Sequence, residues 1–267
     1  MTRWLFGDQL GPAFHGDGDV FLAVSLAHLG RRRWHRQKLH LVLSAMRHLA
    51  DTLGDRATLV VAPTYRAAMA EAGLRPEDLT VAEPTSRAAD AFVRRLGVTV
   101  VRNDGFATHR DDFAGWARDR GSKRLLLEDF YRWQRVRHGV LVEPDGEPSG
   151  GRWNFDADNR EAPPRGATTL GAPPPYHPAE DAIDASVRED LDRWTREGLV
   201  ATVGDDGARW FAATRDEALA ALDTFVGTRL PLFGPHEDAI LGADPAMAHS
   251  LLSPAMNLGL LHPLEIV

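Results

Sequence analysis

Two serines near the C-terminal end of the sequence have the spacing of an anion-binding helix start. In "HSLLSPAMNLGLL" (residues 249–261), Ser250 and Ser253 are separated by two leucines, and Pro254 follows directly. Proline is favoured in the first turn of a helix, and two hydroxyls beside the free N–H groups of that turn could hold a phosphate or pyrophosphate. Ordinary capping by Ser253, with Pro254 as the first helical residue, explains the same pattern, and the residues alone favour it.

Two arginine-rich runs could bind a larger anion. "RRRWHRQK" (31–38) has five basic and no acidic residues, and "RDRGSKRLLLEDFYRWQRVRH" (118–138) has seven basic and three acidic residues. Residues 1–138 carry 22 basic and 16 acidic side chains, against 9 and 22 in residues 139–267. Such patches can neutralise phosphates, so Arg31, Arg32 and Arg33 are candidates for contact with DNA. A solvated helix face is the alternative.

Other familiar chemical signatures are missing. The sequence has no cysteine, which excludes disulfides, thiolate metal sites and a cysteine-ligated iron-sulfur cluster in this chain. Its 11 histidines are scattered without an HExxH motif, so no metal site is expected. There is no GxSxG, GxGxxG or GxxxxGK[ST] motif. No apolar run suits a membrane span or a secretory signal, so we expect no membrane partner and a cytoplasmic location.

The elements that must position these residues alternate along the first part of the chain. Short β-rich runs alternate with helical patterns, which predicts an α/β fold with a doubly wound parallel sheet. Ligands bind such sheets at the carboxyl ends of the strands, where "GDQL" (7–10) and "AEP" (82–84) would lie. The expected strands are residues 3–7, 19–27, 57–63, 79–84 and 98–104, and the expected helices are 36–54, 65–74 and 85–97, the last capped by Thr85.

The later part of the chain has a different character. Residues 160–178 contain six prolines in nineteen positions and are predicted to form an extended linker. Residues 214–234 are predicted to form a helix with Thr214 as its N-cap and with Ala218, Leu219, Leu222, Phe225, Val226 and Leu230 inward. We expect an α/β antenna-type domain at 1–138, an inter-domain motif and linker at 139–178, and the start of a helical domain at 179–267.

Five segments together resemble one family. They are "GDQL", "HRQKLHLVLSAMRHL", "GGRWNFDADNR" (150–160), "TRDEALAALDTFVGTRLPLFG" and "HSLLSPAMNLGLL", in this order. From about residue 5 to residue 267 the sequence resembles the N-terminal half of the deoxyribodipyrimidine photolyase-related proteins. These form the bacterial branch of the cryptochrome/photolyase family that includes iron-sulfur (6-4) photolyases. The resemblance implies a photolyase N-terminal-like α/β domain, followed by an all-helical FAD-binding domain.

The resemblance also implies an activity and site residues. The family's excited, reduced FAD passes an electron to a pyrimidine photoproduct flipped out of damaged DNA, and an antenna chromophore, often a ribityllumazine, harvests light. Four residues match the flavin-phosphate region. Gly7, Asp8 and Gln9 match the loop beside the antenna. The inter-domain junction is expected to be held by Trp153, Asn154, Phe155 and Asp156, rather than these residues contacting cofactor or DNA. The flavin-phosphate residues are Ser250, Leu252, Ser253 and Asn257.

Two departures from the family pattern change the expectation for this chain. Family members are longer, and their remaining part supplies most of the flavin pocket, so we expect the chain to be incomplete as a photolyase. A separately encoded C-terminal half, a stand-alone chromophore- or nucleotide-binding module or photoreceptor fragment, and a decayed fragment remain open. The stretch "SLAHLGRRRWHRQK" has arginines and a tryptophan where the family usually has an acidic residue and a tyrosine. It suits an anionic ligand or DNA phosphates better than ribityllumazine.

Overall fold

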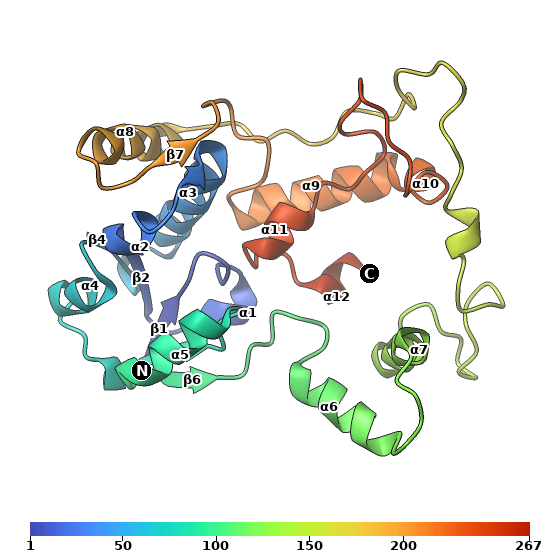
Figure 1. Ribbon diagram of the computed structural model, residues 1–267, viewed down its shortest axis with the longest axis horizontal. Coiled ribbons are helices and arrows are strands. Elements are labelled where there is room, and N and C mark those ends of the chain that lie inside the picture. Colours follow the sequence, from blue (N-terminus) through green and yellow to red (C-terminus); the bar gives the residue numbers. More distant parts are fainter. The chain divides into compact units, whose positions relative to one another are not determined.

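A five-stranded parallel sheet organises the N-terminal part of the molecule (Figure 1). The computed structural model describes all residues from 1 to 267. All neighbouring strands are parallel, in the order β4-β2-β1-β5-β6. From β1 the chain adds β2 and β4 on one side of the sheet, and then β5 and β6 on the other side. The strand order therefore reverses between β1 and β5. This doubly wound parallel arrangement confirms the predicted α/β sheet. The strands are β1 Thr2–Leu5, β2 Val20–Ser25, β4 Ala57–Ala62, β5 Leu79–Ala82 and β6 Thr99–Val101.

A buried aromatic and aliphatic cluster joins the sheet to helices α4 (Tyr65–Glu71) and α5 (Arg87–Leu96). Trp4 and Phe21 of the sheet are fully buried in it, together with Ala68 of α4 and Val93 of α5. Successive residues of a strand point to opposite faces, so these apolar residues define one face of the sheet. Its burial is the main contribution of this layer to stability.

Helix α5 begins one residue later than its predicted cap implies. Thr85 was expected to be the N-cap, but Ser86 holds that position and its hydroxyl accepts from the N–H of Ala89. The Thr85 hydroxyl instead donates to Asp8 at 2.9 Å. Two adjacent hydroxyl residues have the same capping chemistry, so the tertiary contact with Asp8 decides between them.

The long helix α3 (Arg36–Leu53) matches its predicted range and ends at Gly54, which has a φ of 55°. It contacts β4 and helix α8 (Ala182–Arg196). None of its residues belongs to the buried cluster that joins the sheet to α4 and α5. Contact with α8 explains why His40 and Ser44 are buried along with the apolar stripe. Asp181 caps α8 by accepting from the N–H groups of Ile183 and Asp184.

The chain divides into two compact units, each of three segments. The sheet unit comprises Met1–Gly105, Tyr176–Asp223 and Leu251–His262, and the other unit comprises Phe106–Pro175, Thr224–Ser250 and Pro263–Val267. The predicted domain ranges stay predictions. Smaller elements of the sheet unit are α1 Pro12–His15, α2 Leu26–Leu29, η1 Gly54–Arg56, η2 Pro76–Asp78, α11 Ser253–Asn257, and the parallel strands β3 Trp34–His35 and β7 Thr202–Val203.

The segment 251–262 is an integral part of the sheet unit. The N–H of Leu10 donates to the carbonyl of Leu258 at 2.9 Å. A Cβ atom on Gly11 would lie 1.8 Å from the carbonyl oxygen of Gly259, so only glycine allows the two backbones to approach this closely.

The other unit contains helices and irregular backbone. Arg135 of helix α7 (Leu127–His138) is buried, and its guanidinium donates to the carbonyls of Val140, Leu141 and Trp153. Arg229 is also buried and donates to the carbonyls of Pro173, Ala246, Met247 and His249. Residues 160–178 contain no helix or strand, as predicted. The elements that lie within this second unit are α6 Arg110–Asp119, α7 Leu127–His138, η3 Asp156–Asp158, α10 Leu230–Phe233 and α12 Pro263–Ile266.

Helix α9 (Arg215–Thr228) confirms one predicted cap and corrects two predicted core positions. The Thr214 hydroxyl accepts from the N–H of Glu217, whose carboxylate accepts from the N–H of Thr214. Val226 and Leu230 were expected to point inward but are 48% and 44% exposed. The predicted helix is interrupted at Arg229, so the periodicity that placed Leu230 inward does not continue. No helix has the length and apolar character needed to span a bilayer.

Candidate functional site

The carboxyl ends of the central strands open into a large cavity within the sheet unit. Its volume is about 1460 Å³, and its lining includes residues 6–8 after β1, residues 23–25 of β2 and residues 84–86 after β5. Further lining residues lie within the ranges 27–35 in and after α2, 37–46 of α3, the start of α4, 88–95 of α5, 207–211 and 254–258. The cavity therefore lies where the strand order reverses, which is where doubly wound sheets bind their ligands.

The three residues predicted beside an antenna have different roles here. Gly7 and Asp8 line the cavity. A Cβ atom on Gly7 would lie 2.6 Å from Cγ1 of Val42, so the absence of a side chain lets α3 approach the end of β1. Gln9 is fully buried and donates to the carbonyl of Ala82 at 3.0 Å, which ties the end of β1 to the end of β5. Gln9 is thus a support of the site rather than part of its wall.

Aromatic rings form a continuous wall around Tyr65. The centroid of the Tyr65 ring lies 5.6 Å from that of Phe92, 6.1 Å from that of Phe6 and 5.9 Å from that of His28. Burial, and secondarily the charge of Asp8, raise the pKa of Tyr65 to about 12. The phenol therefore stays protonated at neutral pH and can donate a hydrogen bond to a ligand.

A second part of the wall comes from the loop after α2. The ring centroids of His28 and Trp34 are 6.0 Å apart, and the Trp34 indole N–H donates to the carbonyl of Leu29 at 2.8 Å. The guanidinium carbon of Arg32 lies 3.9 Å from the centroid of the Trp34 ring, a cation–π contact. Partial burial, and then the charges of Arg31 and Arg32, lower the pKa of His28, so this imidazole is neutral at pH 7.

Of the four residues predicted for a flavin phosphate, only Asn257 lines the cavity of the sheet unit. Asn257 borders the cavity described above, with Pro254 and Leu258, whereas Leu252 is buried and Ser253 is exposed outside the lining. Ser250 belongs to the other unit. Leu252, not Ser253, is the N-cap of the five-residue helix α11, and no side chain caps it. The predicted role of these four residues at a flavin phosphate stays a prediction.

The residues of "GGRWNFDADNR" (150–160) interact within the second unit. The centroid of the Trp153 ring lies 5.0 Å from the guanidinium carbon of Arg135, and the Trp153 carbonyl accepts from the same group at 3.0 Å. The Asn154 side chain accepts from the N–H of Asp156 at 2.7 Å. Asn154, Phe155 and Asp156 are exposed. Their predicted role at an inter-domain junction stays a prediction.

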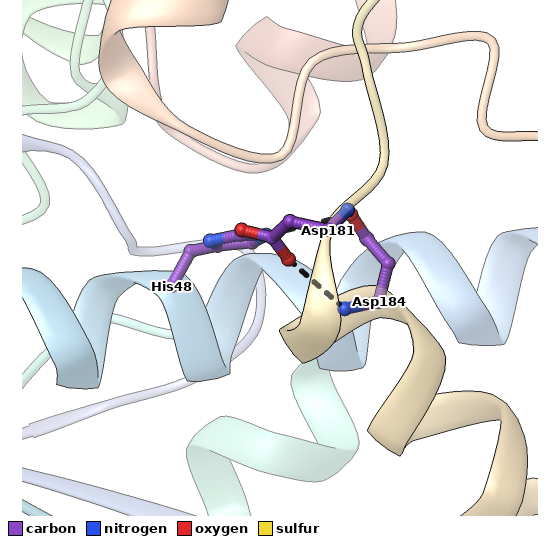
Figure 2. Close-up of side chains that lie close together, drawn as sticks. All are labelled: His48, Asp181 and Asp184. Atoms are coloured by element: carbon purple, nitrogen blue, oxygen red, sulfur yellow. Dashed lines mark hydrogen bonds and ion pairs between the residues drawn. The ribbon is translucent and has the colours of Figure 1, made fainter.

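A polar cluster that the sequence did not reveal lies between α3 and α8 (Figure 2). Nε2 of His48 is 3.7 Å from an oxygen of Asp181 and 3.7 Å from an oxygen of Asp184. Asp184 is fully buried and is paired with Arg209 through two contacts of 3.1 and 3.2 Å. Both carboxylates also accept hydrogen bonds from backbone N–H groups at the start of α8. The cluster is therefore a network of charged and polar groups that joins the two helices.

The sequence signal for this cluster was a polar stripe on α3. His40, Ser44 and His48 recur every four residues and so lie on one face of the helix. The carbonyl of Asp184 lies 3.0 Å from Nε2 of His40. Arg209 gave no such signal, because it lies in irregular backbone and its partners come from two separate helices.

Comparisons with known proteins identify the family of the chain. Residues 3–199 match the family described as "Deoxyribodipyrimidine photo-lyase-related protein". The chain is also 33% identical over 290 residues to a protein of Agrobacterium fabrum named "(6-4) photolyase". That alignment covers 98% of this chain and 54% of the relative, so the chain spans about half the relative's length. Because the family match extends over most of the sheet unit and beyond it, the chain belongs to the deoxyribodipyrimidine photo-lyase-related protein family.

Proposed function

We propose that this chain binds a light-absorbing chromophore in the cavity at the carboxyl ends of its sheet, as part of a protein of the DNA photolyase type. One observation carries the proposal: the cavity lies where the strand order reverses, and aromatic rings line it. Its volume of about 1460 Å³ accommodates a fused-ring ligand together with a side chain. Membership of the photolyase-related family supports a light-dependent role.

The residues of the cavity would bind and orient the chromophore. A bound chromophore supplies light absorption, which no side chain of the chain can supply in the visible range. Tyr65 offers a protonated hydroxyl and His28 a neutral imidazole, so both can make directional hydrogen bonds to ring heteroatoms. The rings of Trp34 and Phe92 offer faces for stacking, which exclude water from the ligand.

For the complete photolyase-related protein, the proposal extends to light-driven, FAD-dependent repair of pyrimidine photoproducts in damaged DNA. The support is the family match and the relative named "(6-4) photolyase". A non-catalytic chromophore- or nucleotide-binding module is the second candidate. It is favoured by one observation, namely that only Asn257 of the four residues expected for the flavin phosphate lines the large cavity of the sheet unit.

The visible absorption spectrum of the purified chain tests the proposal. We expect a band between about 350 and 480 nm, either as purified or after reconstitution with ribityllumazine, riboflavin, FMN or FAD. Trp34→Ala should weaken binding because Trp34 lines the cavity, whereas Trp153→Ala in the other unit is the matched control and should leave it unchanged. A chain that stays colourless with all four compounds would contradict the proposal. A bound chromophore without repair of damaged DNA would favour the non-catalytic module.

A further inference from the structure

The charged side chains that line the cavity are strongly unbalanced. Asp8 is the one carboxylate among them, and Arg209, one of the cations, is neutralised by Asp184 and Glu217. None of the other cations has a carboxylate within ion-pair distance. These remaining cations are Arg31, Arg32, Lys38, Arg66 and Arg95. A cavity with this lining has a positive potential, which favours an anionic ligand.

Two of these cations lie beside the aromatic wall. The Arg32 guanidinium stacks on Trp34, and the charges of both Arg31 and Arg32 act on His28. His28 is in turn 6.0 Å from Trp34 and 5.9 Å from Tyr65, measured between ring centroids. One part of the cavity therefore combines three rings with two guanidinium groups.

Building on the proposed function, we infer that the ligand of this cavity is an aromatic heterocycle that carries a phosphate or carboxylate group. Its ring lies against His28, Trp34 and Tyr65, and its anionic group pairs with Arg31 and Arg32. Guanidinium groups match the geometry of phosphate and carboxylate oxygens and form two parallel hydrogen bonds with them. A neutral ligand of the same shape would leave both guanidinium groups without an anionic partner.

DNA phosphates are the competing occupant of these arginines, but the lining favours a small molecule. Arg31, Arg32 and Arg33 are consecutive and all three are exposed, but only Arg31 and Arg32 line the cavity. A duplex backbone needs no recess and would be contacted by Arg31, Arg32 and Arg33 alike. A recessed ligand, in contrast, would use Arg31 and Arg32 only. Arg33 is therefore a matched control within three consecutive residues.

Riboflavin and FMN provide the test, because they share one ring system and differ by a phosphate. We expect the chain to bind FMN about tenfold more tightly than riboflavin, which is the gain that about 1.4 kcal/mol of charge-assisted pairing produces. The double variant Arg31→Gln/Arg32→Gln should lose this preference and keep its affinity for riboflavin. Arg33→Gln should behave as the unmodified chain. Isothermal titration supplies the affinities, and circular dichroism checks that each variant is folded.

Three outcomes would overturn the inference, and they separate it from the proposed function. Equal affinity for the two flavins, or a preference that survives in Arg31→Gln/Arg32→Gln, would leave a chromophore cavity without an anion subsite. Tight binding of ribityllumazine with unchanged affinity in Arg31→Gln/Arg32→Gln would lead to the same conclusion. An equal loss of the preference for FMN in Arg33→Gln, together with displacement of FMN by duplex DNA, would assign the arginines to DNA binding. If neither flavin nor ribityllumazine binds, the proposed function fails and the inference fails with it.

Discussion

Nε2 of His48, on helix α3, lies 3.7 Å from the buried carboxylate of Asp184 on helix α8. The interaction with Asp184, and then the charge of Asp181, raise the pKa of His48 above its ordinary value against the opposing effects of burial and of Arg209. The contact joins two helices that are distant in the sequence, so the protonation of one histidine is linked to the stability of their packing.

The pH dependence of unfolding should reveal this link. His48 binds a proton more tightly in the folded chain than in the unfolded chain, so protonation stabilises the fold. Its contribution is complete below the unfolded pKa of about 6.5 and is lost as the pH rises through the higher folded pKa. Urea titrations at a series of pH values should therefore show a loss of unfolding free energy in this range, and the His48→Gln variant should show less of it.

His28 provides a control of opposite sign. Its pKa is lowered in the fold, so its contribution to stability is lost as the pH falls below the ordinary histidine pKa. His28→Gln should therefore reduce the loss of stability on the acidic side. Identical pH profiles for the unmodified chain and His48→Gln would refute the assignment.

The buried ion pair of Arg209 should be costly to break. Its side chain is 2% exposed and pairs with Asp184 and with Glu217, the latter at 2.7 Å. Arg209→Met deprives the carboxylates of Asp184 and Glu217 of their guanidinium partner, and we expect a loss of about 3–5 kcal/mol in the free energy of unfolding. Asp184→Asn in the same chain should recover part of this loss. Arg75→Met, at an exposed ion pair, should leave the urea midpoint unchanged, and equal effects at both sites would contradict the expectation.

Gly7 should be coupled energetically to Val42. A methyl group at position 7 would lie 2.6 Å from Cγ1 of Val42, so Gly7→Ala should destabilise the chain by about 1–3 kcal/mol through overpacking. Val42→Ala removes the obstructing methyl group and should relieve the clash in the double variant. A double-mutant cycle of unfolding free energies measures this coupling, and strictly additive effects would show that α3 can shift instead.

Trp153 tests the predicted junction role of "GGRWNFDADNR". Trp153→Ala removes the ring beside Arg135 but keeps the carbonyl that accepts from it. If the segment holds the junction, limited proteolysis followed by mass spectrometry should show faster cleavage within residues 160–178. Phe106→Ala, at an exposed ring of the same unit outside this segment, is the control. Unchanged digestion of Trp153→Ala would count against the junction role.

The predicted flavin-phosphate role of Ser250 and Ser253 can be tested separately. Ser253 is exposed and does not cap α11, so alanine there should cost little stability. Any affinity for FAD that depends on these hydroxyls should fall in Ser250→Ala/Ser253→Ala, and Ser253→Ala alone should leave the urea midpoint unchanged. Thr214→Ala, which removes the cap of α9 and does not line the cavity, should lower the midpoint and spare FAD binding. Full retention of FAD by the double variant would remove the assignment.

The periodic part of the fold was predictable from the sequence. The range 36–54 closely matches α3, since its apolar spacing and its terminal glycine are local signals. The segments 7–10 and 82–84 were correctly expected at one edge of the sheet, because parallel strands share their carboxyl ends. A hydrogen bond between the side chains of Asp8 and Thr85 joins this edge.

The tertiary choices were not predictable in the same way. Ser86 and Thr85 have equal capping ability, and only the contact with Asp8 separates them. His48 and Arg209 find their partners across large sequence separations, for which a single sequence has no local signal. The wall formed by His28, Trp34 and Tyr65 likewise depends on the packing of a loop against α4.

The close approach of Gly11 and Gly259 also bears on how the molecule is made. The sheet unit includes residues 251–262, which leave the ribosome long after the five strands have been synthesised. Until then the N–H of Leu10 lacks its carbonyl partner and the apolar surface that this segment covers is open to solvent. The sheet unit of the nascent chain is therefore incomplete until this distant segment has been synthesised. During this interval its uncovered surface is most accessible to a chaperone or to a misfolding contact.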